Sequence, residues 1–397
     1  MTRERSIVVF SFLLIFMFSS IDNSISPMVE LLNKFYAVPM QSVILLISYC
    51  TFGIIAGIFV GPSLTASFDA GKVVLASAFG MAVPLAFFLA TGDFYAALAC
   101  RAVFGFFLGI AASSMWWVAY YGVSKPYYPS MVVVLMAARP LALALGVPAA
   151  GFMAAASGWR LPYAIFGILL LFSGVFLFAR IIDNGEPPKV KFNPVKIFTG
   201  YSEAFGVKYL ALFYAGFTLN RMCYFGFYSF MGLWFVKHYA ITVVEISKAL
   251  LFIGLAETLV NFIVPHLIKL FGNKNLFTMS IVLSGIVFAA FIGGRFALVP
   301  AVALIALFMV LDRLYVVTAV MAIPEMFSGA NNKTIFGSLN TLTAWAGLAV
   351  ISWVQGRWTE ALGLAVIENI LLASFIAGSA VMYFVQHRTV FAAKKPE

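Results

Sequence analysis

The chain has 397 residues, of which 63% are hydrophobic and only 10% are charged, and its formal net charge is +10. Soluble domains carry about 45–50% apolar and about 25% charged residues, so this composition excludes an ordinary water-soluble core. Apolar runs of about 20 residues, the length that crosses a bilayer, recur along the whole chain and predict a polytopic helical membrane protein. In such a protein the positive charge is typical of cytoplasmic loops, and we do not expect it to bind nucleic acid.

Twelve membrane spans are predicted, and the first is an apolar stretch near the N-terminus. This stretch begins like a signal peptide, but Asp22 and Asn23 follow it instead of a small-residue cleavage site, so we interpret it as an uncleaved span. The predicted spans cover residues 6–27, 40–64, 71–91, 95–121, 129–154, 160–182, 207–236, 244–270, 275–294, 297–325, 332–355 and 362–386.

A polar, proline-containing stretch at 183–206 divides these spans into two sets of six. We therefore expect an N-terminal six-helix bundle at 1–182, a cytoplasmic linker at 183–206 and a C-terminal six-helix bundle at 207–397. Lysines and arginines outside the spans concentrate on one side of this topology, for example in the linker. Because basic residues favour cytoplasmic loops, both termini are predicted to face the cytoplasm of a cell membrane.

Cysteine and histidine patterns predict neither a disulfide nor a metal site. Cys50, Cys100 and Cys223 lie in apolar segments without a CxxC spacing, and three histidines are scattered. Paired acidic motifs, a Ser/His/Asp grouping and a phosphate-binding glycine loop are also missing from the sequence. An enzyme, or a receptor that does not transport, is therefore the least favoured class, and no cofactor is expected.

Two apolar spans in the N-terminal half carry glycine patterns beside arginine. The fourth span has Arg101 followed at four-residue steps by Gly105 and Gly109. Such glycines favour close helix contact. The fifth span has Arg139 and then a run in which Gly146, Pro148 and Gly151 predict a bend. The connection before the third span ends in Asp69, Gly71 and Lys72.

The two sets of six spans, the basic central stretch and these three patterns resemble the major facilitator superfamily over the whole chain. The nearest branch by these motifs is that of the twelve-span drug:proton antiporters. The resemblance implies an all-α polytopic membrane fold of twelve transmembrane helices in two pseudo-symmetric six-helix bundles. It also implies secondary active transport by alternating access, with a small-molecule substrate bound between the two halves near the midplane.

The resemblance further implies gating or packing roles for the motif residues Asp69, Gly71, Lys72, Gly105, Gly109, Gly146, Pro148 and Gly151. Two departures from the family pattern stand out. Phe68 occupies the position of the family's loop acid, so that acid is either missing or supplied by Asp69 after a local shift. Val147 interrupts the Gly-Pro pair of the antiporter motif, and the direction of transport stays open.

Charges inside the predicted spans are the strongest candidates for function, because a charge in hydrocarbon is unfavourable unless it is paired or faces a cavity. Each of them has the alternative interpretation of an ion pair that only fixes helix packing. They are Asp22, Arg101, Arg139, Arg221, Glu257, Asp312 and Arg313.

Depth along the spans predicts which charges meet. Asp22 lies roughly 24 Å from the cytoplasmic start of its span, and Arg101 lies near the outer start of the fourth span, so both fall in the outer half of the bilayer. We predict that they pair and couple transport to protons. Arg221 and Asp312 are expected to mirror this pair in the second half.

Glu257 is a further proton-coupling candidate and shares a helix face with Asn261. Arg139 and Arg313 have no obvious acid of their own. Their charge suits an anionic or zwitterionic substrate, although Arg313 or Arg139 alternatively neutralises Glu257.

An aromatic stripe follows Arg221 in the seventh span at helical spacing: Tyr224, Phe225 and Tyr228. Beside an arginine this stripe predicts a substrate-binding wall, since aromatic rings offer apolar area and cation–π contact. The alternative is a packing face between helices.

The first functional hypothesis is a monomeric secondary transporter that exports a small organic compound against proton entry. The second is uptake or exchange of an organic anion by the same fold, which the excess of arginine motivates. The expected partners are the substrate, protons and the lipid bilayer.

Overall fold

The computed structural model describes residues 2–181, 209–326 and 333–388. Within these ranges the chain is built from helices, with no strand. The all-helical fold predicted from the sequence is confirmed. The predicted linker at 183–206 lies outside the described residues, so its boundaries stay a prediction.

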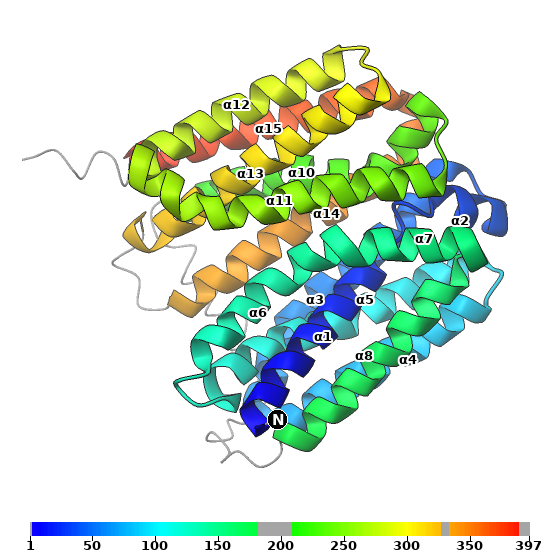
Figure 1. Ribbon diagram of the computed structural model, residues 1–397, viewed down its shortest axis with the longest axis vertical. Coiled ribbons are helices and arrows are strands. Elements are labelled where there is room, and N and C mark those ends of the chain that lie inside the picture. Colours follow the sequence, from blue (N-terminus) through cyan, green and yellow to red (C-terminus); the bar gives the residue numbers. More distant parts are fainter. Residues whose placement is uncertain (1, 182–208, 327–332, 389–397) are drawn as a thin grey trace, which may run out of the picture. The chain divides into compact units, whose positions relative to one another are not determined.

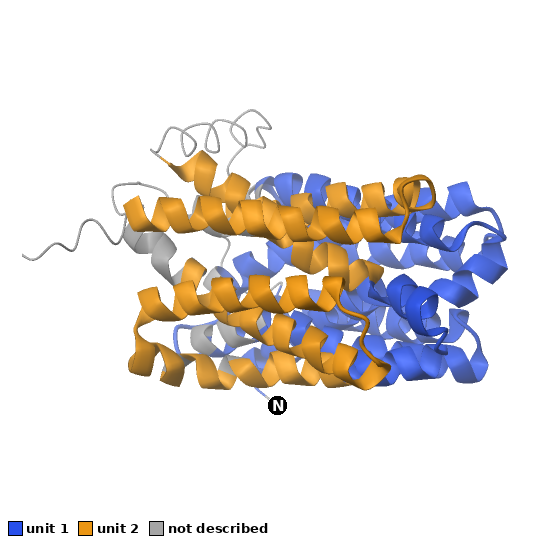
Figure 2. Cartoon of the chain, turned by 90° about the horizontal axis from the view of Figure 1, so that it is seen from above, with its two compact units in different colours: residues 1–197, 231–251 blue, residues 198–230, 252–397 orange. Residues whose placement is uncertain are grey.

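The chain divides into two compact units by its internal contacts. The first unit comprises Met1–Ile197 and Met231–Leu251, and the second comprises Phe198–Phe230 and Phe252–Glu397 (Figure 2). Two long helices, α10 (Leu210–Tyr239) and α11 (Val243–Phe271), contribute residues to both units.

The first unit has α1 packed against α6 and α8, α3 packed against α5, and α4 packed against α5 and α8 (Figure 1). Its helices and helical turns are α1 (Arg3–Asn23), α2 (Val29–Tyr36), η1 (Met40–Ile44), α3 (Leu45–Ser67), α4 (Ala70–Ala90), α5 (Phe94–Trp117), η2 (Val118–Gly122), α6 (Tyr128–Leu141), η3 (Ala142–Gly146), α7 (Val147–Ser157) and α8 (Arg160–Ile181). In the second unit α12 packs against α13 and α15, and α14 packs against α15. The remaining helices are α12 (Asn273–Gly293), α13 (Leu298–Met326), α14 (Lys333–Leu362) and α15 (Leu364–Gln386).

Helices occupy each of the twelve predicted ranges, with ends that differ by a few residues. Nine helical segments in the described part of the chain are long and apolar enough to cross a membrane. They are Arg3–Asn23, Met40–Thr65, Ala70–Ala90, Phe94–Trp117, Ala137–Ser157, Arg160–Ile181, Asn273–Gly293, Leu298–Ala319 and Leu364–Gln386. The number of twelve spans therefore stays a prediction.

The first predicted span extends too far at its C-terminal end. α1 ends at Asn23, and after a turn the short helix α2 runs over Val29–Tyr36. Ser24 donates its hydroxyl back to the carbonyl of Ser20, which competes with the helical hydrogen bonds of the backbone. Pro27 lacks a backbone N–H and does not continue the helix.

A π-helical turn lies where the fifth span is predicted to bend. Ala142–Gly146 forms this turn between α6 and α7. Pro140 and Pro148 flank it, and each removes one backbone hydrogen bond that a wider turn accommodates. Gly146 faces α1 at this point, because a Cβ at Gly146 would lie 2.0 Å from the hydroxyl oxygen of Ser20.

Glycines hold α3 and α5 in direct backbone contact. A Cβ at Gly105 would lie 1.9 Å from the carbonyl oxygen of Cys50, and one at Gly109 would lie 2.3 Å from that of Ile54. Gly53 and Gly57 make the same kind of contact from α3. The four-residue spacing therefore serves close packing of these two helices.

We expect Gly105→Val to lower the free energy of unfolding by about 3 kcal/mol or more, because the obstructing atom is backbone and cannot rotate away. Thermal unfolding of the purified chain in detergent measures this loss. Gly293→Val is the matched control, since a Cβ at Gly293 meets nothing within 4 Å. Equal melting temperatures for the two variants would contradict this account of the α3–α5 contact.

Candidate functional site

Asp22 and Arg101 meet in the first unit as their depth predicts. Asp22 lies near the C-terminal end of α1, and Arg101 lies in the second turn of α5. The Arg101 Nη2 atom is 3.4 Å from Asp22 Oδ1, and both side chains are almost completely buried. The predicted pairing is confirmed, and its role in proton coupling stays a prediction.

The side chains of Asp22 and Arg101 share only one contact, and its N···O distance is long for an ion pair. Arg101 Nη2 also donates to the backbone carbonyl of Asp22 at 3.1 Å, and its Nε donates to the carbonyl of Leu46 at 3.3 Å. Asp22 Oδ1 accepts a second hydrogen bond from the Cys50 thiol at 3.2 Å. The side-chain amide of Asn23 donates to Oδ2 at 3.3 Å. Asp22 is thus held by several weak contacts instead of one strong pair.

Arg139 adds positive charge to the same region. It lies in the last turn of α6, is partly buried, and acts electrostatically on Cys50, which is bonded to Asp22. The sequence offered no partner for Arg139, and the structure places it in this cluster of the first unit.

Arg221 and Asp312 form a tight pair in the second unit. Arg221 Nη1 donates to Asp312 Oδ2 at 2.9 Å, and Nη2 donates to Oδ1 at 2.5 Å, so the pair is bidentate. The guanidinium also bonds to the side-chain oxygen of Asn220, whose amide nitrogen donates to Ser379 on α15 at 3.2 Å. The predicted pairing of α10 with α13 is therefore confirmed, and it extends into a network that includes α15.

Two side chains of the described residues contact Glu257 on α11. Arg313 contacts Glu257 Oε1 through Nη2, and the Tyr224 hydroxyl donates to the same oxygen at 2.6 Å. The side chain of Arg313 is 22% exposed, whereas that of Glu257 is 4% exposed. Arg313 thus pairs with Glu257, as one of its two predicted roles requires, and its role in binding an anionic substrate stays a prediction.

The aromatic stripe of α10 serves more than one purpose. Tyr224 is committed to Glu257, and its ring packs edge-on against Phe225 at 4.9 Å between centroids. Phe225 is partly exposed and lies nearly parallel to Trp345 of α14, with centroids 6.5 Å apart and planes 9° apart. Tyr228 is buried. A substrate-binding role for the stripe stays a prediction.

Asp69 caps α4. Its side chain accepts a hydrogen bond from the backbone N–H of Lys72 at 2.9 Å, which stabilises the start of the helix. Gly71 is buried in the first turn of α4. Asp69 and Lys72 also line a cavity of about 400 Å³ together with Leu64, Ser67, Phe68, Val73, Ala76, Ser77, Phe107 and Ile110. The local position of Asp69 is explained by capping, and a gating role stays a prediction.

A second set of close contacts joins Met231–Leu251 to the rest of the first unit. The backbone N–H of Gly232 donates to the Ser26 hydroxyl at 3.1 Å. A Cβ at Gly151 would lie 1.9 Å from the Ser247 hydroxyl oxygen. Gly151 was expected from its motif, but its partners were not, because small residues in apolar runs carry no signal for which helix they face.

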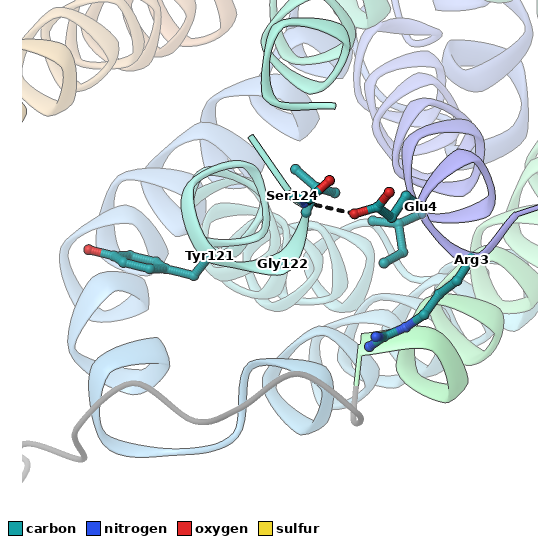
Figure 3. Close-up of a pocket in the computed structure, with 7 residues that line it drawn as sticks. Arg3, Glu4, Tyr121, Gly122 and Ser124 are labelled. Carbon is teal, nitrogen blue, oxygen red and sulfur yellow. Dashed lines mark hydrogen bonds between the residues drawn. The ribbon is translucent and has the colours of Figure 1, made fainter. Parts of the chain in front are cut away.

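A cavity of about 310 Å³ lies where α1 begins. Figure 3 shows Glu4 bonded across it to the backbone N–H of Ser124, at 2.9 Å between Ser124 N and Glu4 Oε1. Arg3 Nε donates to the carbonyl of Arg180 at the end of α8, at 2.8 Å. These bonds fasten the start of α1 to two neighbouring segments of the first unit. Sequence reasoning used Arg3, like other lysines and arginines, only to orient the chain, and it did not consider Glu4.

The comparisons with known proteins agree with this architecture. The family model described as the Major Facilitator Superfamily matches residues 8–351. The chain belongs to the major facilitator superfamily. It is therefore a multi-pass membrane protein and a secondary transporter, not an enzyme.

Two solved structures show the same fold at low sequence identity. The human organic anion transporter MFSD10 (TETRAN) is 16% identical with a TM-score of 0.67, over 96% of this chain and 100% of that one. A D-xylose-proton symporter is 17% identical with a TM-score of 0.67, over 98% of each chain. A search of curated proteins found no match.

Proposed function

We propose that this superfamily member exports a small organic compound in exchange for protons, by alternating access, and that Asp22 is the principal coupling group. The observation that carries the proposal is the weak hold on Asp22: a single 3.4 Å contact to Arg101 in an almost fully buried site.

A coupling acid has to bind and release a proton in every transport cycle. A carboxylate in a short bidentate pair resists protonation, because the pair is lost when the proton arrives. Asp312 is held in this way by Arg221. Asp22 has a single, longer contact with the guanidinium of Arg101, and Glu257 shares one oxygen between Arg313 and Tyr224.

Export is favoured by the glycine and proline pattern at Gly146, Pro148 and Gly151, which resembles the antiporter motif. The close contacts of Gly146 with Ser20 and of Gly151 with Ser247 support a role for this segment in sealing or releasing neighbouring helices. Asp69, Gly71, Lys72, Gly105 and Gly109 belong to the same proposal as gating or packing residues.

The remaining features of the proposal follow from the charge distribution and the fold. The excess of lysine and arginine in the predicted cytoplasmic segments supports a cell-membrane protein with both termini inside. The proposed arrangement is a monomer with bundles at 1–182 and 207–397, joined by the linker at 183–206.

A vesicle experiment tests the proposal. A binding screen of the purified chain by thermal shift, at two pH values against drugs, sugars, amino acids and organic anions, first supplies a substrate. In proteoliposomes, an imposed proton gradient should then drive this substrate in the direction opposite to proton flow. Movement that ignores the proton gradient would refute the coupling.

Transport of an organic anion is the second candidate, and Arg313 is the observation that favours it. Its Nε atom has no hydrogen-bond partner among the described residues, while its side chain is 22% exposed. The Nε atom itself is buried, so a carboxylate that enters beside the exposed part of the side chain would give this donor a partner. Phe225 and Trp345 provide an apolar neighbour for the rest of such a molecule, linked to this site through Tyr224.

If this second candidate holds, Arg313→Gln in a Glu257→Gln background should weaken binding of an organic anion by roughly 10- to 100-fold, since a charge-assisted hydrogen bond is lost. The Glu257→Gln background prevents a buried carboxylate from being left without its partner. Isothermal titration with the anion identified in the screen measures the change. The exposed Arg295→Gln serves as the control, and a preference for cationic dyes would contradict this candidate.

A further inference from the structure

Two buried tyrosines lie beside the Asp22–Arg101 pair without protein partners for their hydroxyl groups. Tyr163 of α8 is 0% exposed, Tyr36 of α2 is 7% exposed and Arg101 is 1% exposed. In the described part of the chain, neither hydroxyl nor Arg101 Nη1 has a hydrogen-bond partner. Buried polar atoms are normally satisfied, so three such atoms in one region are groups with free capacity for further hydrogen bonds.

The three groups lie close enough to act on one another. The charge of Arg101 acts on both hydroxyls, and the Tyr36 hydroxyl acts on that of Tyr163. The rings share Phe88 and Trp159 as neighbours: Phe88 lies 5.5 Å from Tyr163 and 6.5 Å from Tyr36 between centroids. Trp159 lies 6.1 Å from Tyr163 and 6.2 Å from Tyr36. The aromatic packing holds both phenols in place.

Protonation of Asp22 creates an electrostatic problem for this region. Of the described groups whose charge acts on Arg101, Asp22 is the one carboxylate. When it takes a proton, the buried guanidinium loses its counter-charge, which is strongly unfavourable unless other acceptors solvate it. The carbonyls of Asp22 and Leu46 and the ring of Phe104, 5.4 Å away, already serve Arg101 in the ionised state.

We propose that Tyr163, assisted by Tyr36, accepts hydrogen bonds from Arg101 when Asp22 is protonated. A phenol oxygen has lone pairs for this purpose, and Arg101 Nη1 has a donor to spare. The proton binds an Asp22 carboxylate oxygen, and no other bond changes except the hydrogen bonds of the guanidinium. The tyrosines are positioning residues, and this assignment rests on the proposed role of Asp22.

The sign of the effect follows from the neighbours of Asp22. Arg101 on α5 and the Cys50 thiol on α3 contact the Asp22 carboxylate, and the charge of Arg139 on α6 acts on Cys50. The Tyr36 and Tyr163 hydroxyls stabilise the guanidinium in the protonated state and so favour protonation of Asp22. Removing one of them should make Asp22 harder to protonate, and half-protonation should require a lower pH.

Tyr163→Phe removes the hydroxyl and keeps the ring. Infrared difference titration of the full-length purified chain follows the protonated carboxyl band, which Asp22→Asn assigns to Asp22, and needs no substrate. We expect the midpoint to fall by about one pH unit, a tenfold change in the protonation equilibrium. Tyr36→Phe should shift it in the same direction by less, and the double variant should shift it furthest. Tyr95→Phe, at a residue that is 78% exposed, is the control and should leave the midpoint unchanged.

The outcomes separate this inference from the proposed function. If Tyr163→Phe and Tyr36→Phe leave the midpoint of the Asp22 titration unchanged, or move it to higher pH, the positioning role of the tyrosines is overturned. Asp22 then remains the coupling group. If the wild-type chain shows no infrared band of Asp22 that changes with pH, the proposed coupling is overturned. This inference then fails as well. Loss of stability without a shift of the midpoint identifies a purely structural role for the two tyrosines.

Discussion

Asp22→Asn should abolish the accumulation of substrate against its gradient and leave downhill movement in place. The amide keeps the size of the side chain and can still bond to its neighbours, but it does not bind a proton near neutral pH. For each proton exchanged per cycle, a gradient of one pH unit sustains about a tenfold concentration ratio of substrate. In proteoliposomes with the variant this ratio should fall to one.

The control for this variant is Asp93→Asn in the same unit. Asp93 precedes α5, and its side chain accepts a hydrogen bond from the backbone N–H of Ala96 at 2.6 Å. Asparagine caps helices about as well as aspartate does. This control should therefore keep full coupled transport. If Asp22→Asn still concentrates the substrate when a proton gradient is imposed, Asp22 is not the coupling group, and Glu257→Gln becomes the next variant to measure.

The pairing of charges was largely predictable because depth follows directly from helical rise. Asp22 with Arg101 was expected from depth, Arg221 with Asp312 was expected as the mirror of that pair in the second half, and both pairs form. Arg139 shows where this reasoning ends. Its helix is apolar on every face, so hydrophobic periodicity does not indicate which side chains converge on it.

Tyr36 and Tyr163 were not predicted for a related reason. Both lie near the ends of apolar segments, where aromatic residues are typical of a membrane interface and carry no specific signal. Their importance depends on helices α2 and α8 approaching the same pair of rings, Phe88 and Trp159, which only the tertiary structure establishes. The end of α1 was misplaced because the helix ends near Ser24 and Pro27, inside the range that was assigned to one span.

Single removal of either partner of the Arg221–Asp312 pair should destabilise the protein strongly. Arg221→Gln or Asp312→Asn should lower the free energy of unfolding by about 3–5 kcal/mol, because each leaves an uncompensated charge in a buried site. The double variant should recover most of this loss. Its Gln amide can still donate to Asn220, and the two new amides can bond to each other.

Thermal unfolding of the wild type, the two single variants and the double variant in detergent measures the coupling energy between Arg221 and Asp312. Lys34→Gln and Glu30→Gln form the matched cycle at the surface, where the two side chains are 68% and 31% exposed and their coupling should be within about 1 kcal/mol. If the coupling energy of Arg221 and Asp312 is no larger than that of Lys34 and Glu30, the buried pair does not have the static role that we assign to it. A large coupling energy for Arg221 and Asp312, together with coupled transport that depends on Asp22, would assign the Arg221–Asp312 pair to helix packing. The Asp22–Arg101 pair would then be assigned to proton exchange.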